Sequence, residues 1–358
     1  FRRVLFRSTN DKLSKSDLKN IGNDAFETAS KYGKKATDYL SGVQEASRAG
    51  YENAENIAEL STAAQGAGDM TAELANSYII ATDKAYGMEG SVQKLTQTLD
   101  GANEITNHNA VNMTELAEGM KVVGSQAASS QISVEETTAA LGTLIAVTQQ
   151  GGSQMGNAFK GILMNLRQVT GEVDGEEIDQ ESLTKYEKAC EALGVSLSEV
   201  KDGAVSLKEP MQILKELSAE YTKLDKDDAK RANLLSAIGG KYRANALNAI
   251  LENWSTYENM LQQYADGDGS MAEEAEKTAN SLEGSLNKLS NTWTDTVQNI
   301  LDSDTLNSGV KVLNTVLDLI NKITDKLGLF GTAGLTIGTI LGVKNVGRAN
   351  HISELSLF

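Results

Sequence analysis

Residues that carry chemistry are scarce in this chain of 358 amino acids. A single cysteine, Cys190, excludes an intramolecular disulfide and any metal site built from several cysteines. The two histidines, His108 and His351, stand far apart, so a Ser-His-Asp triad or a His-rich zinc site has almost no material. Only one proline, Pro210, is present, and proline is the residue that breaks helix interiors. The composition therefore favours long helices and speaks against an enzyme.

Basic residues and aromatic residues are also few. Lysine and arginine number 33 against 49 acidic residues, which gives a net charge of −16. Binding to nucleic acid by phosphate neutralisation needs a basic face, so specific nucleic-acid binding is not expected. Aromatic residues make up 5% of the chain, so the core must consist of Leu, Ile, Val, Ala and Met. A hydrophobic content of 40% is too ordinary for a wholly disordered chain.

No motif for a cofactor, a metal or catalysis is present. The GxxxxGK[ST] phosphate loop and the strand-GxGxxG-helix pattern are both missing, so we predict no catalytic residue and no cofactor. His108 lies in the polar run TNHN and is expected at a solvated turn or helix end. Cys190 lies in KACEALG and is expected to be a small buried hydrophobe. Lys188, two positions away, does not share its helix face and so would not stabilise a thiolate.

The two ends differ in character from the rest. Residues 1–8, FRRVLFRS, match the translation of a common sequencing adaptor, and we expect them to be an assembly artefact. Residues 327–343 carry no charge and, at roughly 17 residues, lie at the lower edge of the length that spans a bilayer. Gly334, Gly338 and Gly342 repeat there at the spacing of close helix packing in membranes. A membrane-active segment and an apolar stretch packed on other helices both remain open. Residues 344–358 are expected to be a truncated tail.

Residues 9–170 read as a succession of amphipathic helices. Asn112-x-x-Glu115 and Ser133-x-x-Glu136 predict capping boxes at two helix starts. The glycine pair 151–152 is expected to stop the second of these helices. The next predicted helix carries one apolar face. That face consists of Phe159, Ile162, Leu163 and Leu166.

Residues 171–269 form a second helical region that begins with an acidic run. Residues 172–181 hold six carboxylates without the spacing of a calcium loop, which predicts a solvated acidic loop. A helix is expected near 182–193, and a short hairpin is expected around Asp202-Gly203. Ser206-x-x-Glu209 with Pro210 predicts the start of the following helix. Two more helices are expected, one near 227–238 stopped by the glycine pair 239–240, and a longer one over 247–261.

Residues 270–326 are expected to form long amphipathic helices. An apolar seam with near-heptad spacing predicts either a coiled coil or one long helix on a globular neighbour. The seam starts at Ala275 and Ala279 and continues through Leu282, Leu286, Leu289, Trp293, Val297 and Ile300. A further helix is predicted over 308–327 with two apolar faces. The fold class predicted for the whole chain is all-α, as an elongated array of helices with one short β-hairpin.

The order of these patterns resembles a known family. The stretch NMTELAEGMKVVGSQAASSQISVEETTAALGTLIAVTQQGGSQMGNAFKGILMNLRQ, residues 112–168, is similar to the core of phage tail tape measure proteins of the TP901 type. LLSAIGGKYRANALNAILENW, residues 234–254, and SMAEEAEKTANSLEGSLNKLSNTW, residues 270–293, resemble the segments that follow this core in phages and prophages of Gram-positive bacteria. The resemblance covers about three quarters of the chain.

The resemblance implies a structural protein of a siphophage virion. Such a protein lies in the lumen of the tail tube, scaffolds tube assembly, sets tail length, and leaves at infection to help DNA enter the host. The implied partners are copies of the chain, the tail tube protein, tail assembly chaperones, distal tail or baseplate proteins, and the host membrane. The implied locations are the virion, the host cytoplasm during assembly and the host envelope at infection. Hydrolase domains of some family members are not seen in this chain.

Three other readings stay open at this stage. A chemoreceptor-like signalling coiled coil predicts heptads over far more of the chain and no hairpin near Asp202. A tail-associated lysin predicts a catalytic cleft, against which the two isolated histidines speak. A helical pore-forming protein would share the apolar glycine segment and insert into lipid without any tail partner.

Overall fold

The computed structural model describes residues 15–166, 180–201 and 204–302, and this part of the chain is almost entirely helical. The predicted all-α class is confirmed. The elements of the N-terminal half are α2 (Lys15–Lys31), α3 (Ala36–Arg48), α4 (Ala54–Gly68), α5 (Ala72–Tyr86), α6 (Val92–His108), α7 (Met113–Ser129), α8 (Val134–Thr148) and α9 (Gly152–Leu166). Those that follow are α10 (Gln180–Glu191), β1 (Ser198–Lys201), β2 (Ala204–Leu207), α11 (Pro210–Tyr221), α12 (Ala229–Leu234), the π-helix η1 (Leu235–Gly239), α13 (Gly240–Glu252), α14 (Trp254–Ala265), α15 (Ser270–Ala279) and α16 (Leu282–Asp302).

The chain divides into two compact units. Unit 1 combines the two ends of the chain, up to Leu40 and from Glu276 onward, and unit 2 comprises Ser41–Ala275. Unit 2 holds the region for which the sequence predicts successive amphipathic helices, and unit 1 holds the long helix α16.

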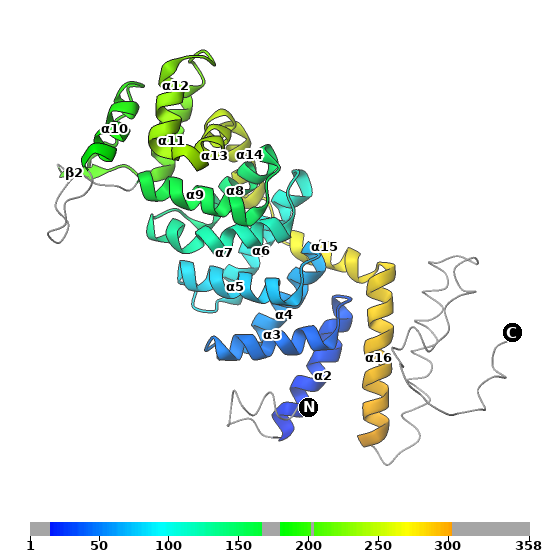
Figure 1. Ribbon diagram of the computed structural model, residues 1–358. Coiled ribbons are helices and arrows are strands. Elements are labelled where there is room, and N and C mark those ends of the chain that lie inside the picture. The colour runs from blue at the N-terminus through cyan, green and yellow to red at the C-terminus, as the bar shows by residue number, and fades with distance from the viewer. Residues whose placement is uncertain (1–14, 167–179, 202–203, 303–358) are drawn as a thin grey trace, which may run out of the picture. The chain divides into compact units, whose positions relative to one another are not determined.

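Unit 2 is a stack of helices in two rows. In one row α5, α7 and α9 lie one above the other, as Figure 1 shows, and α13 follows against α9. In the other row α6 contacts α4 and α8, and α14 packs across α6 and α8. Successive helices connect the rows, since α4 contacts α5 and α8 contacts both α7 and α9. Buried Leu, Ile, Met and Ala side chains fill the space between the rows, among them Leu99, Ile105, Leu116, Leu141 and Leu144.

The two predicted capping boxes are confirmed. The Asn112 side chain accepts a hydrogen bond from Glu115 N at 2.8 Å, and the Glu115 carboxylate accepts one from Asn112 N at 3.2 Å. Ser133 and Glu136 form the same reciprocal pair at the start of α8, at 3.2 and 3.0 Å. These bonds satisfy amide groups that have no partner within the helix.

The glycine pair 151–152 does not stop α8, so that prediction is wrong. The helix ends at Thr148, and Gln149 takes the left-handed conformation that follows, with φ +54°. Gly152 is instead the first residue of α9. The predicted apolar face of α9 is confirmed, because Phe159, Ile162 and Leu163 are fully buried and Leu166 is 3% exposed.

The predicted hairpin is confirmed by the pairing of β1 with β2. The strands are antiparallel, with Ser198 opposite Leu207 and Lys201 opposite Ala204, so the connection falls at residues 202–203 as expected. Pro210 opens α11 at its first position, also as expected. The predicted Ser206 cap is wrong, because Ser206 pairs within β2 and Glu209 occupies the cap position.

The glycine pair 239–240 ends the helical run formed by α12 and the π-helix η1, as predicted, because η1 ends at Gly239 and Gly240 follows with a φ of +59°. The next helix, α13, starts directly at Gly240. The longer helix expected over 247–261 is two helices, α13 and α14, separated at Asn253. The Asn253 side chain donates to Ala249 O at 2.8 Å. Such side-chain competition for backbone groups favours a helix end.

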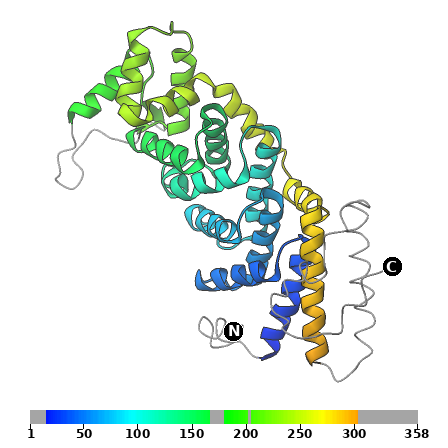
Figure 2. The ribbon, with the colours of Figure 1, turned by 45° about the vertical axis from the view of Figure 1, so that its right-hand side comes forward.

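Unit 1 pairs α2 with α16, which lie side by side in Figure 2. The Asn291 side chain donates to Lys34 O at 2.7 Å and accepts from Ala36 N at 3.3 Å, while Asn287 donates to Gly33 O at 2.9 Å. Two asparagines of α16 thus hold the turn between α2 and α3. Gly33 has φ +65°, and a Cβ there would lie 2.8 Å from the Cα atoms of Ala279 and Gly284.

The helix predicted to carry the whole seam from Ala275 to Ile300 is interrupted. The chain leaves the helix at Asn280 and Ser281, between α15 and α16. The Ser281 hydroxyl accepts a hydrogen bond from Gly284 N at 3.1 Å, which caps the new helix. The prediction of a single long helix is therefore wrong, because Ser281 caps a new helix at a point where the heptad spacing indicated a continuous one.

Candidate functional site: a glycine crossing, a carboxylate clamp and a lysine-rimmed cleft

The six seam residues from Leu282 to Ile300 all fall on α16. Leu289 is buried, with 1% of its surface exposed, and Leu286 is half-buried. The side chains of the other four lie outside the described part; they are Leu282, Trp293, Val297 and Ile300. Gly334, Gly338 and Gly342, the acidic loop over 172–179 and the helix predicted over 308–327 also lie outside the described residues. These predictions therefore remain predictions.

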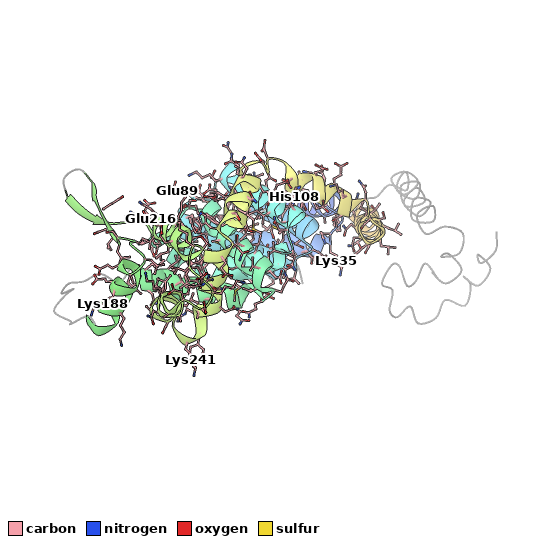
Figure 3. The ribbon with its side chains drawn as sticks, turned by 90° about the horizontal axis from the view of Figure 1, so that it is seen from above. Lys35, Glu89, His108, Lys188, Glu216 and Lys241 are labelled. Atoms are coloured by element: carbon pink, nitrogen blue, oxygen red, sulfur yellow. The ribbon has the colours of Figure 1, made fainter. Side chains whose placement is uncertain are left out.

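His108 and Cys190, the two residues considered as candidates for catalysis, have contacts that suit a structural role. His108 is the last residue of α6, and its exposed ring lies 3.0 Å from Glu104 O and 3.2 Å from the Glu104 carboxylate (Figure 3). Cys190 is fully buried, and burial raises the pKa of its thiol to about 12. Within the described ranges, no cluster of His, Cys, Asp and Glu side chains could hold a metal ion. Nor does any helix of this part have the length and apolarity needed to cross a bilayer.

The closest backbone contact in unit 2 is the crossing of α7 and α9. A Cβ on Gly152 would lie 1.8 Å from Glu115 O, and one on Gly156 would lie 2.6 Å from Gly119 O. Gly119 lies on the α7 side of this contact, and a Cβ on Gly119 would lie 3.1 Å from Gly152 O. Only glycine permits such an approach, because any side chain would overlap a backbone oxygen. The GGSQMG sequence, residues 151–156, is therefore a helix-crossing motif.

A buried carboxylate clamps the start of α15. Asp100, 2% exposed on α6, accepts hydrogen bonds from Gly269 N at 3.1 Å and Met271 N at 3.0 Å. Burial raises the pKa of Asp100, while the two amide donors oppose that rise. The Ser270 hydroxyl donates to the Glu104 carboxylate at 2.8 Å. The negative charge lies at the positive end of the helix, where it is favoured.

Glycines let the neighbouring segments approach this clamp. A Cβ on Gly101 would lie 2.6 Å from the ring of Tyr264, and one on Gly267 would lie 2.8 Å from Asp100 O. The DGDGS run, residues 266–270, indicates from sequence alone only a separation between two helices. The two glycines beside two acidic residues in this run were the available sign of a close contact. The partner, Asp100 on α6, is far away in sequence and could not be predicted.

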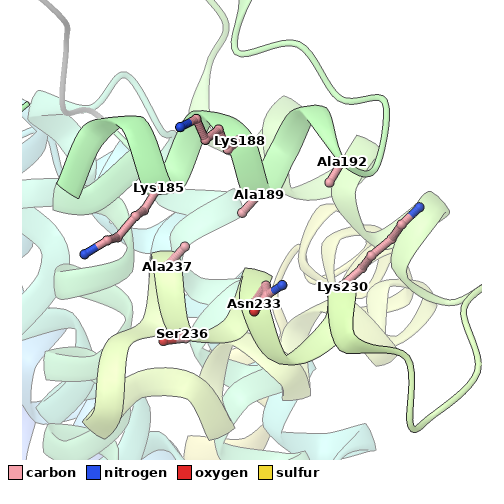
Figure 4. Close-up of a pocket in the computed structure, with 8 residues that line it drawn as sticks. All are labelled: Lys185, Lys188, Ala189, Ala192, Lys230, Asn233, Ser236 and Ala237. Atoms are coloured by element: carbon pink, nitrogen blue, oxygen red, sulfur yellow. The ribbon is translucent and has the colours of Figure 1, made fainter. Parts of the chain in front are cut away.

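A cleft of about 510 Å³ opens between α10 on one side and α12 with η1 on the other (Figure 4). Three lysines line it, together with small and polar residues; the lining is Lys185, Lys188, Ala189, Ala192, Lys230, Asn233, Ser236 and Ala237. Figure 4 shows the amine groups of Lys188 and Lys230 directed away from each other at the rim. No carboxylate belongs to this lining. The sequence analysis did not predict this site, because its residues come from two separate helices.

Comparison with known proteins now adds the family. No solved structure matches the chain. Residues 23–240 match the family described as phage-related minor tail protein, which is more than half of the chain. The matched region includes α4 to α9 with the glycine crossing, and it reaches through α12 and η1 to the start of α13. The chain belongs to the family of phage-related minor tail proteins.

Proposed function

We propose that this phage tail protein is a tape measure protein of the TP901 type from a phage or prophage of a Gram-positive host. It scaffolds assembly of the tail tube, sets tail length, and is released at infection to help DNA pass into the host. The observation that carries the proposal is the coincidence of two regions: the segment that resembles the tape measure core forms α7, α8 and α9, inside the family match.

Physical properties of the chain suit a ruler. Helices have a fixed rise of about 1.5 Å per residue, and the single proline of the chain opens a helix without interrupting one. The net charge of −16 repels DNA, so DNA that enters an emptied tube would not be retained by residual protein. Carboxylates on an acidic surface also oppose non-specific association.

The partners belong to the same proposal. They are other copies of the chain, the tail tube protein, tail assembly chaperones, distal tail or baseplate proteins and, at infection, the host membrane. The residues 334, 338 and 342, all glycine, offer close helix packing in or against a membrane.

The signalling coiled coil is the less favoured alternative. The longest helix of the described chain is α16, with 21 residues, and the helices of unit 2 are shorter. A signalling coiled coil needs heptads sustained over many turns. The membrane-active reading concerns residues 327–343, which a liposome-insertion assay of the chain without tail proteins would address.

The test is the tail length of the parent phage after in-frame deletion of residues 182–267. Removing about 86 residues should shorten the tail by roughly 130 Å if the segment lies as extended helix along the tube. The matched control replaces the deleted segment with an unrelated helical sequence of equal length, which should restore the original tail length. Shortened tails with restored length in the control support a ruler. Tails of unchanged length after the deletion would sink the proposal.

A further inference from the structure

The lysine-rimmed cleft lies on a distinct face of α10. One face of this helix packs inward through Tyr186 and Cys190, which are 3% and 0% exposed. Lys185, Lys188, Ala189 and Ala192 share the neighbouring face, because they are three, four or seven positions apart. Glu187 lies about half a turn away from the cleft face, and Glu191 follows Lys188 by three positions. Neither glutamate belongs to the lining of the cleft.

The opposite wall is equally one-sided. Lys230 and Asn233 lie one turn apart on α12, and Ser236 and Ala237 continue the wall on η1. Arg231 is directed inward: it is 8% exposed, it pairs with Glu252, and its guanidinium lies 4.0 Å from the ring of Tyr221. Within the part of the chain that the structure describes, neither Lys188 nor Lys230 forms an ion pair. Their charges are thus available at the rim.

The shape and the charge of the cleft select the class of occupant. Alanines at 189, 192 and 237 make a shallow apolar floor, which permits the close approach of another helix. The amine groups diverge along the rim in Figure 4, so they do not converge on one point as a compact phosphate would require. An elongated partner with carboxylates spaced along it would meet each amine in turn. Aromatic side chains, on which nucleic-acid bases stack, are missing from the lining.

We propose that the cleft between α10 and α12 docks an acidic amphipathic helix of another tail protein, with small apolar residues toward the alanine floor and carboxylates toward Lys188 and Lys230. Charge complementarity supports this occupant, because the lining carries the amines of Lys188 and Lys230 and no carboxylate, on a chain with 49 acidic and 33 basic residues. Opposite charges at a rim steer association and select the partner more than they add affinity. This inference does not depend on the ruler role.

The test is direct binding of a synthetic helical probe to the full chain. The probe is a fluorescent peptide of about 14 residues that carries alanine and leucine on one face and glutamate on the other; its control replaces every glutamate with lysine. The glutamate peptide should bind and the lysine peptide should not. The double variant K188E/K230E should weaken binding at least about tenfold, and raised salt should weaken it as well.

Matched variants separate the cleft from general charge effects. Lys121 and Lys160 are exposed on α7 and α9, away from the cleft lining, so K121E/K160E changes the net charge equally and should leave binding unchanged. Ala192→Trp should block the floor, whereas Ala232→Trp, at an exposed position on the far side of α12, should not. Thermal denaturation of every variant identifies any that misfold, and the surface charge variants should melt with the wild type.

Four results would overturn the inference. The glutamate peptide could fail to bind, or it could bind the K188E/K230E variant as well as the wild type. A single-stranded DNA of about 20 nucleotides could bind with the same dependence on Lys188 and Lys230, which would make the cleft a nucleic-acid site. Finally, a photo-cross-linker at position 192 could react with residues 172–179 of the same chain in place of the bound peptide, which would make the occupant internal.

Discussion

Single glycines decide how close the helices of unit 2 come to one another. At the crossing of α7 and α9 the limiting contact is between backbones, because Gly152 and Gly156 face the carbonyl groups of Glu115 and Gly119. Elsewhere in a helix a change from glycine to alanine raises stability by roughly 0.5–1 kcal/mol. At this crossing the steric overlap reverses the sign, since neither partner is a flexible side chain.

Gly152→Ala should lower the free energy of unfolding of unit 2 by about 3 kcal/mol, as overpacked contacts do. The urea midpoint of the full chain, followed by circular dichroism, checks this. Gly151→Ala is the matched control, because nothing lies within 4 Å of its would-be Cβ, and it should cost less than about 1 kcal/mol. A Gly152→Ala protein as stable as the control would show that the crossing is not as close as described.

Cys190 should be unreactive in the folded chain. Burial raises the pKa of its thiol to about 12, so at pH 8 only about one molecule in 10⁴ carries the thiolate that reacts. As the sole cysteine it gives an unambiguous signal with a thiol reagent such as Ellman's reagent. Reaction should be slow in buffer and immediate in urea; rapid reaction of the folded chain at pH 8 would contradict the buried position.

The same shift predicts a pH dependence of stability. The pKa of the thiol is higher in the folded than in the unfolded chain, so its contribution is fully present below the ordinary value of 9.0. That contribution is lost as the pH rises from about 9 toward 12. A Cys190→Ala variant lacks this loss, so the difference in stability between wild type and variant should shrink over that interval.

At the scale of helices, local signals were readable in the sequence and contacts between distant segments were not. The capping boxes at Asn112 and Ser133 are complete within four residues, so the sequence alone predicts them correctly. The Pro210 start and the hairpin are equally local. The role of Gly152 depends on Glu115, and the role of Asp100 depends on Gly269 and Met271. Their spacing in sequence carries no trace of these contacts.

The break between α15 and α16 illustrates the limit most clearly. The apolar spacing from Ala275 onward is regular enough to predict a continuous heptad helix, but Ser281 caps a new helix. Hydrophobic periodicity reports which face is buried and says little about a polar cap between two turns. The lysine-rimmed cleft escaped prediction for a different reason, because α10 and α12 meet only in the folded chain.

Asn291 should be the main anchor between α16 and the turn after α2. It is 5% exposed and makes hydrogen bonds with Lys34 O and Ala36 N, so Asn291→Ala leaves two backbone groups without their partner. The expected cost is about 2 kcal/mol. Hydrogen exchange of the Ala36 amide should accelerate about 30-fold.

Exchange measured by mass spectrometry on peptides that cover residues 32–40 checks the anchor. Asn280→Ala is the control, because Asn280 is exposed between α15 and α16 and should leave this exchange unchanged. Equal exchange rates in wild type and Asn291→Ala would mean that the turn is held by other contacts.

At the scale of the whole molecule, the chain is poor in aromatic residues and in proline. Four of its described helices, α5 to α8, have a side chain that caps the amino-terminal end. A helix whose terminal backbone amide groups are hydrogen-bonded by a nearby side chain can keep its length when the neighbouring helices change. This is the property that a phage tail protein of the proposed kind needs, because axial length follows from the number of helical residues.

The most direct test of that proposal compares two deletions of different length in the parent phage. Deletion of residues 182–267 removes about 86 residues, and deletion of residues 180–207 removes about 28, namely α10 with the hairpin, which lies apart from the rows of α4 to α9. If each deleted stretch lies as extended helix along the tube, tail lengths measured by electron microscopy should fall by about 130 Å and about 42 Å, a constant decrement per residue. Tails of the wild-type length in both deletion phages would contradict the account.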